Sequence, residues 1–205
     1  SPLDPQTSNG VDIGASYSAG GYSFTISAYY MRLRDEIHYN PVSFENVNLD
    51  PTRRYGLELS GTAEINERLR LQGNYTYMRS KFRDGPFDGN TVPLVPENTA
   101  TVSAIWKQSP ATDLIVAASY IDNKYFDNDQ SNTFGRNIPS YKTVDAKISH
   151  RFRGYRVTAE ANNIFEEKAV DYGVSSSSAP GVYSAYPLPE RTLLFTVSKA
   201  FGGAS

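Results

Sequence analysis

Regular alternation of apolar and polar side chains from Tyr141 to Phe165 is the feature that most constrains the fold. Successive side chains of a strand point to opposite faces, so the alternation predicts two strands, each with one apolar and one polar face. Only Arg153 and Gly154 separate the two arms, which predicts a hairpin. The apolar face carries Val144, Ala146, Ile148, Phe152, Tyr155, Val157, Ala159 and Ala161, and the polar face carries Lys147, Arg151, Arg156 and Glu160. A soluble sandwich usually avoids such a charged face over long paired strands.

The same period continues along the chain and predicts nine antiparallel strands with no helix. They are expected at residues 11–18, 22–39, 55–65, 69–78, 99–107, 114–126, 141–152, 155–165 and 191–201, with the facing of 114–126 left open. Their connections alternate between short ones, at 19–21, 66–67, 109–111 and 153–154, and long ones that begin near Asn40, Asp84, Asp127 and Glu166. In a meander, all tight turns then lie at one rim and all long loops at the other. Outer-membrane β-barrels have this asymmetry, whereas soluble up-and-down barrels show it weakly.

Composition separates these two kinds of barrel poorly, because half of each membrane-spanning strand also faces water. With 39% hydrophobic and 20% charged residues, the chain has the averages of a soluble protein. The 15 Tyr, 10 Phe and single Trp discriminate better, since many of them fall into two groups at the strand ends. Tyr17, Tyr22, Phe24, Trp106, Phe152, Tyr155 and Phe201 lie near the short turns, and Tyr30, Tyr55, Tyr75, Tyr77, Tyr120 and Tyr141 toward the long loops. Two aromatic girdles are typical of a membrane-spanning barrel, although Tyr is also common in strands generally.

Several classes of protein are disfavoured by what the sequence lacks. It has no Cys, so it forms no disulfide and no thiolate metal site. No apolar run is long enough for a spanning helix, which says nothing against spanning strands. A net charge of −2 with dispersed basic residues argues against a nucleic-acid partner. The start, Ser1 to Gly10, lacks the basic and apolar runs of a signal peptide.

No constellation of residues predicts an enzyme, a metal site or a resident cofactor. His38 and His150 are far apart without metal-ligand spacing and are expected to be rim or girdle residues. The adjacent acids at 35–36 and at 166–167 point in opposite directions in extended chain, so neither pair forms a carboxylate site. The four serines at 175–178 are interpreted as a flexible loop, and no Gly-x-Ser-x-Gly motif occurs.

Six ordered motifs resemble the C-terminal part of a TonB-dependent outer-membrane receptor, and the resemblance covers nearly the whole chain. They are LDPQTS at 3–8, PTRRYGLEL at 51–59, NYTY at 74–77, VPLVPEN at 92–98, NNIFEEK at 162–168 and PLPER at 187–191. Each motif alone is weak, and their shared order makes the resemblance specific. The chain departs from the family's pattern at its end, where Gly-Gly-Ala-Ser follows the aromatic Phe201 and Lys199 lies on the apolar face.

The resemblance implies a transmembrane antiparallel up-and-down β-barrel of about 22 strands in the cell outer membrane of a Gram-negative bacterium. It further implies import of a scarce chelate, such as a ferric siderophore, by force that TonB transmits from the inner membrane. Residues 1–205 would supply the last nine strands. An odd number of strands does not close in this class, so about thirteen strands, the plug domain and the TonB-binding segment are expected outside these residues. The chain is then an excerpt, or it pairs with another chain.

The candidate ligand-binding residues lie in the expected long loops, where a chelate arriving from outside would meet them. They are Tyr125, Phe126, Phe134, Arg136, Tyr172, Tyr183 and Tyr186. Aromatic rings and Arg suit an anionic, partly aromatic chelate through stacking and charge-assisted hydrogen bonds, although the same residues could simply pack the loops together. The polar wall residues Glu58, Arg70, Lys147, Arg151, Arg156 and Glu160 are expected to contact a plug domain or to line water.

Other functions remain open at the level of sequence. The cargo could be cobalamin, haem, another metal chelate or a sugar. A passive porin would share the barrel but have no plug and no TonB-binding segment. An outer-membrane barrel enzyme is disfavoured by the absence of paired His and Ser residues, and a soluble β-barrel binder would not require detergent for extraction.

Overall fold

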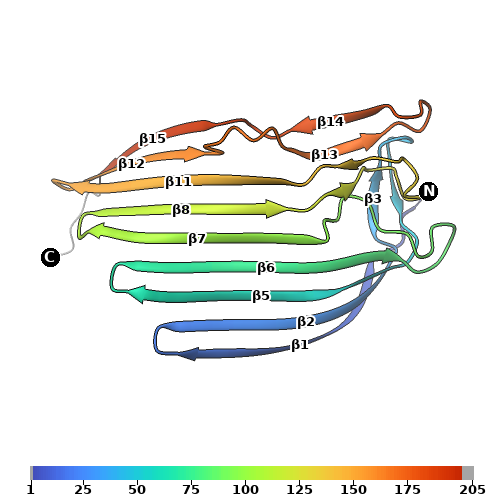
Figure 1. Cartoon of the computed structure of the whole chain (residues 1–205). Coiled ribbons are helices and arrows are strands. Elements are labelled where there is room, and N and C mark those ends of the chain that lie inside the picture. The colour runs from blue at the N-terminus through green and yellow to red at the C-terminus, as the bar shows by residue number, and fades with distance from the viewer. Residues whose placement is uncertain (1, 200–205) are drawn as a thin grey trace.

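Nine long strands form a single antiparallel sheet in a computed structural model that describes residues 2–199 (Figure 1). Their order in the sheet is β1-β2-β5-β6-β7-β8-β11-β12-β15, so each long strand pairs with the next one along the chain. The bounds are β1 Thr7–Ala19, β2 Tyr22–Arg34, β5 Thr52–Asn66, β6 Leu69–Phe82, β7 Asn98–Ser109, β8 Thr112–Ile121, β11 Tyr141–Phe152, β12 Tyr155–Asn162 and β15 Thr192–Lys199. The predicted all-β meander is confirmed. Within residues 2–199, no helix is long and apolar enough to cross a membrane.

All four short turns lie at one end of the sheet and all four long loops at the other, as the sequence predicts (Figure 1). The turns are residues 20–21, 67–68, 110–111 and 153–154, and the loops are residues 35–51, 83–97, 122–140 and 163–191. Gly20 and Gly21 have φ of 58° and 83°, and Arg153 and Gly154 have φ of 49° and 79°. Two successive residues at positive φ match the right-handed twist of hairpin strands, which makes these turns tight.

Register places the alternating apolar residues of all nine strands on a common face. Leu57 of β5 lies opposite Ala28 of β2 and Tyr77 of β6. In β8, whose facing the sequence left open, Val116 lies opposite Ala104 of β7 and Ala146 of β11. The other face carries the polar side chains. We call these two surfaces the apolar face and the polar face.

The apolar face is not covered by any other part of the described chain. Ile148 and Val157 are 46% and 44% exposed, and Phe195 near the free edge is 73% exposed. A soluble protein would bury such a surface, so the face requires an apolar solvent such as lipid. Lys199 shares this face, but it lies at the short-turn end, where its amine is 4.8 Å from the ring centroid of Tyr155. An amine at that level can reach the membrane interface. The predicted girdle residue Phe201 lies outside the described residues.

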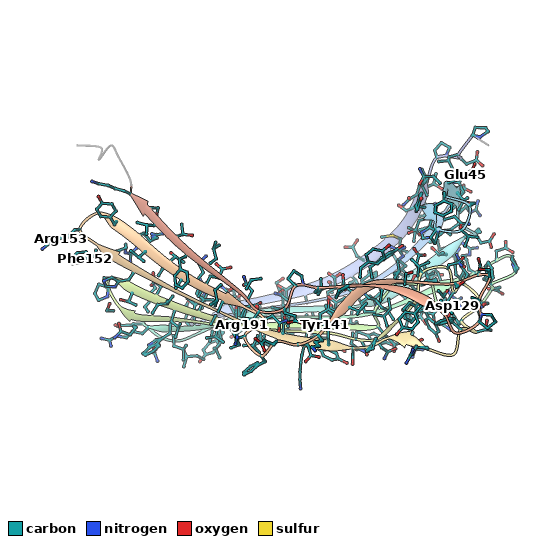
Figure 2. The ribbon with its side chains drawn as sticks, turned by 90° about the horizontal axis from the view of Figure 1, so that it is seen from above. Glu45, Asp129, Tyr141, Phe152, Arg153 and Arg191 are labelled. Atoms are coloured by element: carbon teal, nitrogen blue, oxygen red, sulfur yellow. The ribbon has the colours of Figure 1, made fainter. Side chains whose placement is uncertain are left out.

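The buried core lies at the long-loop end of the molecule. Leu33 and Phe82 belong to the polar face of β2 and β6, and they are 4% and 1% exposed. The loop residues Val92, Phe126 and Ile138 are also buried. Figure 2 shows the bowed sheet, with Phe152 and Arg153 at one end and Glu45 and Asp129 among the loops at the other. The loops therefore cover the polar face only at the outer rim.

Three expected strands are wrong in extent, and residues at positive φ interrupt two of them. Asp35 has φ of 57° and ends the strand expected at 22–39 at Arg34. Asn163 has φ of 51° and ends the strand expected at 155–165 at Asn162. The strand expected at 114–126 ends at Ile121. The first strand also begins earlier than expected, at Thr7.

The long loops contain short strands that the sequence analysis missed. In the described chain they pair as β3 Ile37–Asn40 with β4 Glu45–Asn48, β9 Lys124–Tyr125 with β10 Asn137–Ile138, and β13 Val170–Ser175 with β14 Tyr183–Pro187. The stretch expected to be irregular at 166–190 therefore holds a hairpin. Ser175 is also wrongly interpreted as flexible loop, because it is buried in β13 and its hydroxyl donates to the carbonyl of Asp127 at 3.1 Å.

The two faces of β8 predict losses of stability of different size for the same substitution at adjacent alanines. Ala118 lies on the apolar face and Ala117 on the polar face. In the full-length protein refolded into lipid vesicles, A118R should lower the free energy of unfolding by about 2–4 kcal/mol, because the charge enters hydrocarbon. The matched variant A117R should cost less than about 1 kcal/mol, because its charge meets water. Urea titrations followed by Trp fluorescence measure both, and equal losses would contradict the assignment of the faces.

Candidate ligand-binding loops

Asp127 joins three of the four long loops at a buried point. Its Oδ2 accepts a hydrogen bond from the Tyr172 hydroxyl at 2.7 Å, and its Oδ1 lies 3.1 Å from His38 Nε2. Its backbone N–H donates to the Gly173 carbonyl at 2.8 Å, and its carbonyl accepts from the Ser175 N–H at 3.0 Å. Because the Asp127 side chain is only 3% exposed, water competes little for these contacts.

The electrostatics of this junction favour an ion pair. Burial alone would raise the pKa of Asp127, but the contacts with His38 and Tyr172 outweigh burial and lower it. The contact with the Asp127 carboxylate raises the pKa of His38 despite partial burial. Burial, followed by the hydrogen bond to Asp127, raises the pKa of Tyr172, so its phenol stays protonated as the donor.

Further contacts extend the junction to the loop at residues 83–97 and to β11, where the Tyr141 hydroxyl donates to Asp171 at 3.0 Å. The Asn90 side chain donates to the Gln130 carbonyl at 3.0 Å, and the Thr91 N–H donates to Asn132 Oδ1 at 2.6 Å. Lys124, whose side chain is 8% exposed, pairs with Asp171 at 2.6 Å. All four loops therefore form one hydrogen-bonded layer over the rim.

Four of the seven predicted ligand-binding residues form a single aromatic cluster. The ring of Phe126 lies 5.4 Å from that of Phe134 and 4.9 Å from that of Tyr183. The guanidinium carbon of Arg136 lies 5.2 Å from the centroid of the Tyr183 ring, and Nη1 donates to its hydroxyl at 3.3 Å. Phe126 is 2% exposed and supports the cluster from below, whereas Arg136 and Tyr183 are exposed at its edge. Only that edge can meet a ligand directly.

The other three predicted residues lie beside this cluster or apart from it. Tyr172 and Tyr186 contact each other with tilted rings whose centroids lie 5.4 Å apart, and Tyr186 is 59% exposed. Tyr172 is tied by its hydroxyl to Asp127, so its role is to hold β13 in place. Tyr125 lines a separate cavity of about 320 Å³ that also has Arg79, Lys81, Asn123 and Asn137 in its wall. The seven residues thus divide into a buried support and an exposed edge.

Sequence reasoning missed the junction at Asp127. It expected His38 to be a rim or girdle residue, and it used Asp127 only to mark the start of a long loop. The two histidines do not share a site, because His150 lies in β11 at the short-turn end, with Nδ1 2.8 Å from the Thr112 hydroxyl. Among residues 2–199, no group of three His, Cys, Asp or Glu side chains could hold a metal ion. A usable signal was the position of Asp127 directly after two aromatic residues, Tyr125 and Phe126, in an otherwise polar loop.

A small cavity lies beneath the junction, on the polar face. Its volume is about 200 Å³, and Glu36, His38, Arg54 and Asp127 line it together with apolar residues such as Phe82. Arg54 forms an ion pair with Glu36 and so presents a fixed hydrogen-bonding surface. A cavity of this size holds a few waters or a small polar group.

Four of the six predicted polar wall residues, Arg70, Lys147, Arg151 and Glu160, form ion pairs between neighbouring strands. Glu64 pairs with Arg70 at 2.9 Å, Lys147 with Glu160 at 3.3 Å, and Arg151 with Asp113 at 4.0 Å. These side chains are partly exposed, so their carboxylates and guanidinium groups remain available to a further contact.

A sheet with an uncovered apolar face, a charged inner wall and a layer of bonded loops at one rim is a segment of a transmembrane β-barrel. Residues 1–164 match the family model described as TonB dependent receptor-like, beta-barrel, and the chain belongs to this family.

The known proteins that the chain resembles agree with this assignment. It is 29% identical over 186 residues to the ferrioxamine receptor of Yersinia enterocolitica, a match that covers 85% of this chain and 26% of that protein. It is 20% identical over 190 residues to an iron-regulated outer membrane virulence protein of Vibrio cholerae, covering 83% and 29%. The crystal structure of the ferric yersiniabactin uptake receptor FyuA from Yersinia pestis superposes with a TM-score of 0.78 at 20% identity, covering 94% and 29%.

The chain spans between a quarter and a third of the length of these proteins. The likeness to FyuA shows the fold, and the family match places the chain in the bacterial outer membrane. The predicted family, fold class and localisation are confirmed.

The ion pair between His38 and Asp127 predicts that the loop layer loosens as the pH rises. The pKa of His38 is raised in the folded state, so its stabilising contribution is complete below about pH 6.5 and is lost as the pH rises through the folded pKa. The pKa of Asp127 is lowered, so its contribution is complete above about pH 4 and is lost as the pH falls further. The pair is therefore strongest between these limits.

Hydrogen–deuterium exchange of the β3–β4 hairpin in the full-length receptor measures this effect. After correction for the intrinsic exchange rate, protection should fall as the pH rises above about 6.5 and passes the raised pKa of His38. H38Q should remove the pH dependence, and the control H150Q should retain it. Equal dependence in H38Q would refute the assignment to this pair.

Proposed function

We propose that residues 1–205 are the C-terminal part of the β-barrel domain of a receptor that imports a ferric siderophore across the outer membrane by TonB-dependent active transport. The observation that carries this proposal is the exposed edge of Arg136, Tyr183 and Tyr186, held at the long-loop rim of a chain from this family. A cationic and aromatic edge suits an anionic chelate with planar iron-binding groups. The relative named as a ferrioxamine receptor supports an iron chelate as cargo.

Transport, rather than catalysis, is the proposed activity. Two of the named relatives are a ferrioxamine receptor and a ferric yersiniabactin uptake receptor, which supports transport. The proposed partners are the ferric siderophore at the loops, a plug domain against the polar wall, and TonB through a segment outside this chain. Arg156, Lys147 and Glu160 lie on the wall that such a plug would face.

Uptake by living cells tests the proposal directly. A strain that lacks the full gene is grown under iron limitation with single ferric siderophores, and iron uptake is followed with and without TonB. At least one siderophore should fail to support growth of the deletion strain. The plasmid-borne gene should restore uptake of that siderophore only when TonB is present. Uptake that persists without TonB would instead indicate a passive channel.

The exposed Arg136 should contribute to affinity for the cargo. R136Q in the full-length receptor removes the cation over the Tyr183 ring and should weaken binding of the ferric siderophore by about three- to thirtyfold. The matched control is R153Q, because Arg153 also lies over an aromatic ring, that of Phe152 at 5.0 Å, but at the opposite rim. Fluorescence quenching titrations measure both affinities. An R136Q affinity equal to that of R153Q would remove Arg136 from the binding surface.

Removal of residues 170–186 should abolish cargo binding and leave the barrel folded. This segment carries Tyr172, Tyr183 and most of the β13–β14 hairpin, but no residue of the nine-stranded sheet. The barrel should keep its heat-resistant migration in gels, because its strand pairing is intact. Unchanged siderophore affinity in the deletion variant would show that this loop plays no part in binding.

A further inference from the structure

Five cationic side chains continue the apolar face beyond its outer aromatic girdle. In β2, Arg32 and Arg34 lie on the same face as Tyr30, two and four residues further along the strand. In β5, Arg53 lies on the same face as Tyr55. Lys81 of β6, and Arg83 directly after the end of β6, continue the face that carries Tyr75 and Tyr77. We call Arg32, Arg34, Arg53, Lys81 and Arg83 the basic rim. These residues lie on the opposite face of the sheet from the polar wall, and Arg32, Arg34 and Arg83 line a cavity separate from the one that Tyr125 lines.

Strand register brings the basic rim together. Arg32 lies directly opposite Arg53, and Arg53 lies directly opposite Lys81, so three cations form one cross-strand row over β2, β5 and β6. Side chains at directly opposite positions have Cβ atoms about 5 Å apart, and like charges there destabilise a sheet. The row therefore calls for a counter-charge.

The described chain supplies no such counter-charge. None of the four arginines of the basic rim forms an ion pair with a carboxylate in residues 2–199, whereas Arg54, Arg79 and Lys124 at the same rim each have one. Arg53 Nε is buried without any hydrogen-bond partner in this part of the chain. Arg32 donates only to the neutral hydroxyl of Tyr30, at 3.1 Å, and Lys81 only to the Gly89 carbonyl, at 2.9 Å.

A cavity provides room for an anion beside these groups. It measures about 260 Å³ and is lined by Arg32, Arg34, Arg83, Thr7 and Asn9. Three guanidinium groups give forked donors that match the oxygens of a phosphate, and the Thr7 and Asn9 side chains add neutral donors.

The neighbouring sector of the same rim is built differently. There the Asp122 carboxylate accepts from the side chains of Asn98 at 2.7 Å and Tyr120 at 3.2 Å, and Asn98 in turn accepts from Tyr75 at 2.7 Å. These groups satisfy one another and include an acid. Within β6, Arg79 lies on the same face as Lys81 and is also satisfied, because it pairs with Glu97. The missing counter-charge is therefore specific to the basic rim.

We propose that the basic rim binds the phosphate groups of an anionic lipid in the outer leaflet of the membrane. The site lies on the lipid-facing surface, one step beyond the aromatic girdle, which is the level of lipid headgroups. A lipid phosphate would neutralise the cross-strand row, give Arg53 Nε an acceptor, and fix the outer rim in the leaflet. The inference rests on the orientation of the barrel in the membrane and is independent of the identity of the cargo.

The test uses the purified full-length receptor in neutral detergent, freed of lipid, with native mass spectrometry to count bound lipid. The probes are lipid A, its dephosphorylated form, and inorganic phosphate as competitor. The site variant is R32Q/R34Q/R83Q, and the control R70Q/R151Q/R156Q removes the same charge from the polar wall. Lipid A should bind the wild type and the control, and the site variant should bind at least about tenfold more weakly. Dephosphorylation should weaken binding to a similar extent.

Three results would overturn the proposal. The first two are an equal loss of lipid A affinity in both triple variants and equal affinities for lipid A and its dephosphorylated form. The third is full displacement of lipid A by millimolar inorganic phosphate, which would indicate a site for the free anion. Because the site variant could fold poorly, R32K/R34K/R83K serves as a second variant that keeps the charge. Its affinity should fall between those of the wild type and the Gln variant, since Lys lacks the forked donor geometry. Heat-resistant migration and siderophore uptake are measured in parallel, so failure of lipid binding is separable from failure of transport.

Discussion

A strand in a lipid bilayer must have every backbone N–H and C=O paired, because hydrocarbon offers no alternative partner. This constraint determines the rest of the structure. It requires each long strand to pair along both edges, and a meander of two-residue turns and long loops achieves that for all but β1 and β15. It also divides the side chains into two sets, since alternate positions must face lipid and the rest must face water. For this reason Phe195, which lies opposite Ala159, is on the apolar face, whereas the next residue of β12, Glu160, is on the polar face.

The alternation made the sheet predictable from the sequence, because each long strand carries many residues that repeat the same signal. The interruptions at Asp35 and Asn163 carried less information, since a single residue at positive φ leaves the apolar pattern around it unchanged. The pairs β3–β4 and β9–β10 span four and two residues per strand, which is too short for a periodic pattern. Their formation depends on the loop layer as a whole.

The candidate site was predictable in composition and not in geometry. Aromatic residues and Arg136 in the loops pointed to a binding surface, but the sequence does not distinguish the buried Phe126 from the exposed Tyr186. That distinction depends on contacts between residues far apart in the chain, such as the contact of Asp127 with His38. It depends also on Gly173, where a Cβ atom would lie 2.7 Å from the Phe126 ring. A glycine in a short strand gives no indication of which ring will pack against it.

The arrangement of these loops has a consequence for affinity. A ligand that binds long mobile loops must order them, and each immobilised side chain costs about 0.5–1.5 kcal/mol. In this chain the cost is largely met on folding, because Asp127 ties three loops together and Phe126 supports the ring of Tyr183 from below. The exposed edge of Arg136 and Tyr183 is then a prepared surface on a fixed base. The same Asp127 that makes the layer rigid is paired with the one described histidine at this rim, His38, so rigidity of the surface and protonation of that histidine are linked.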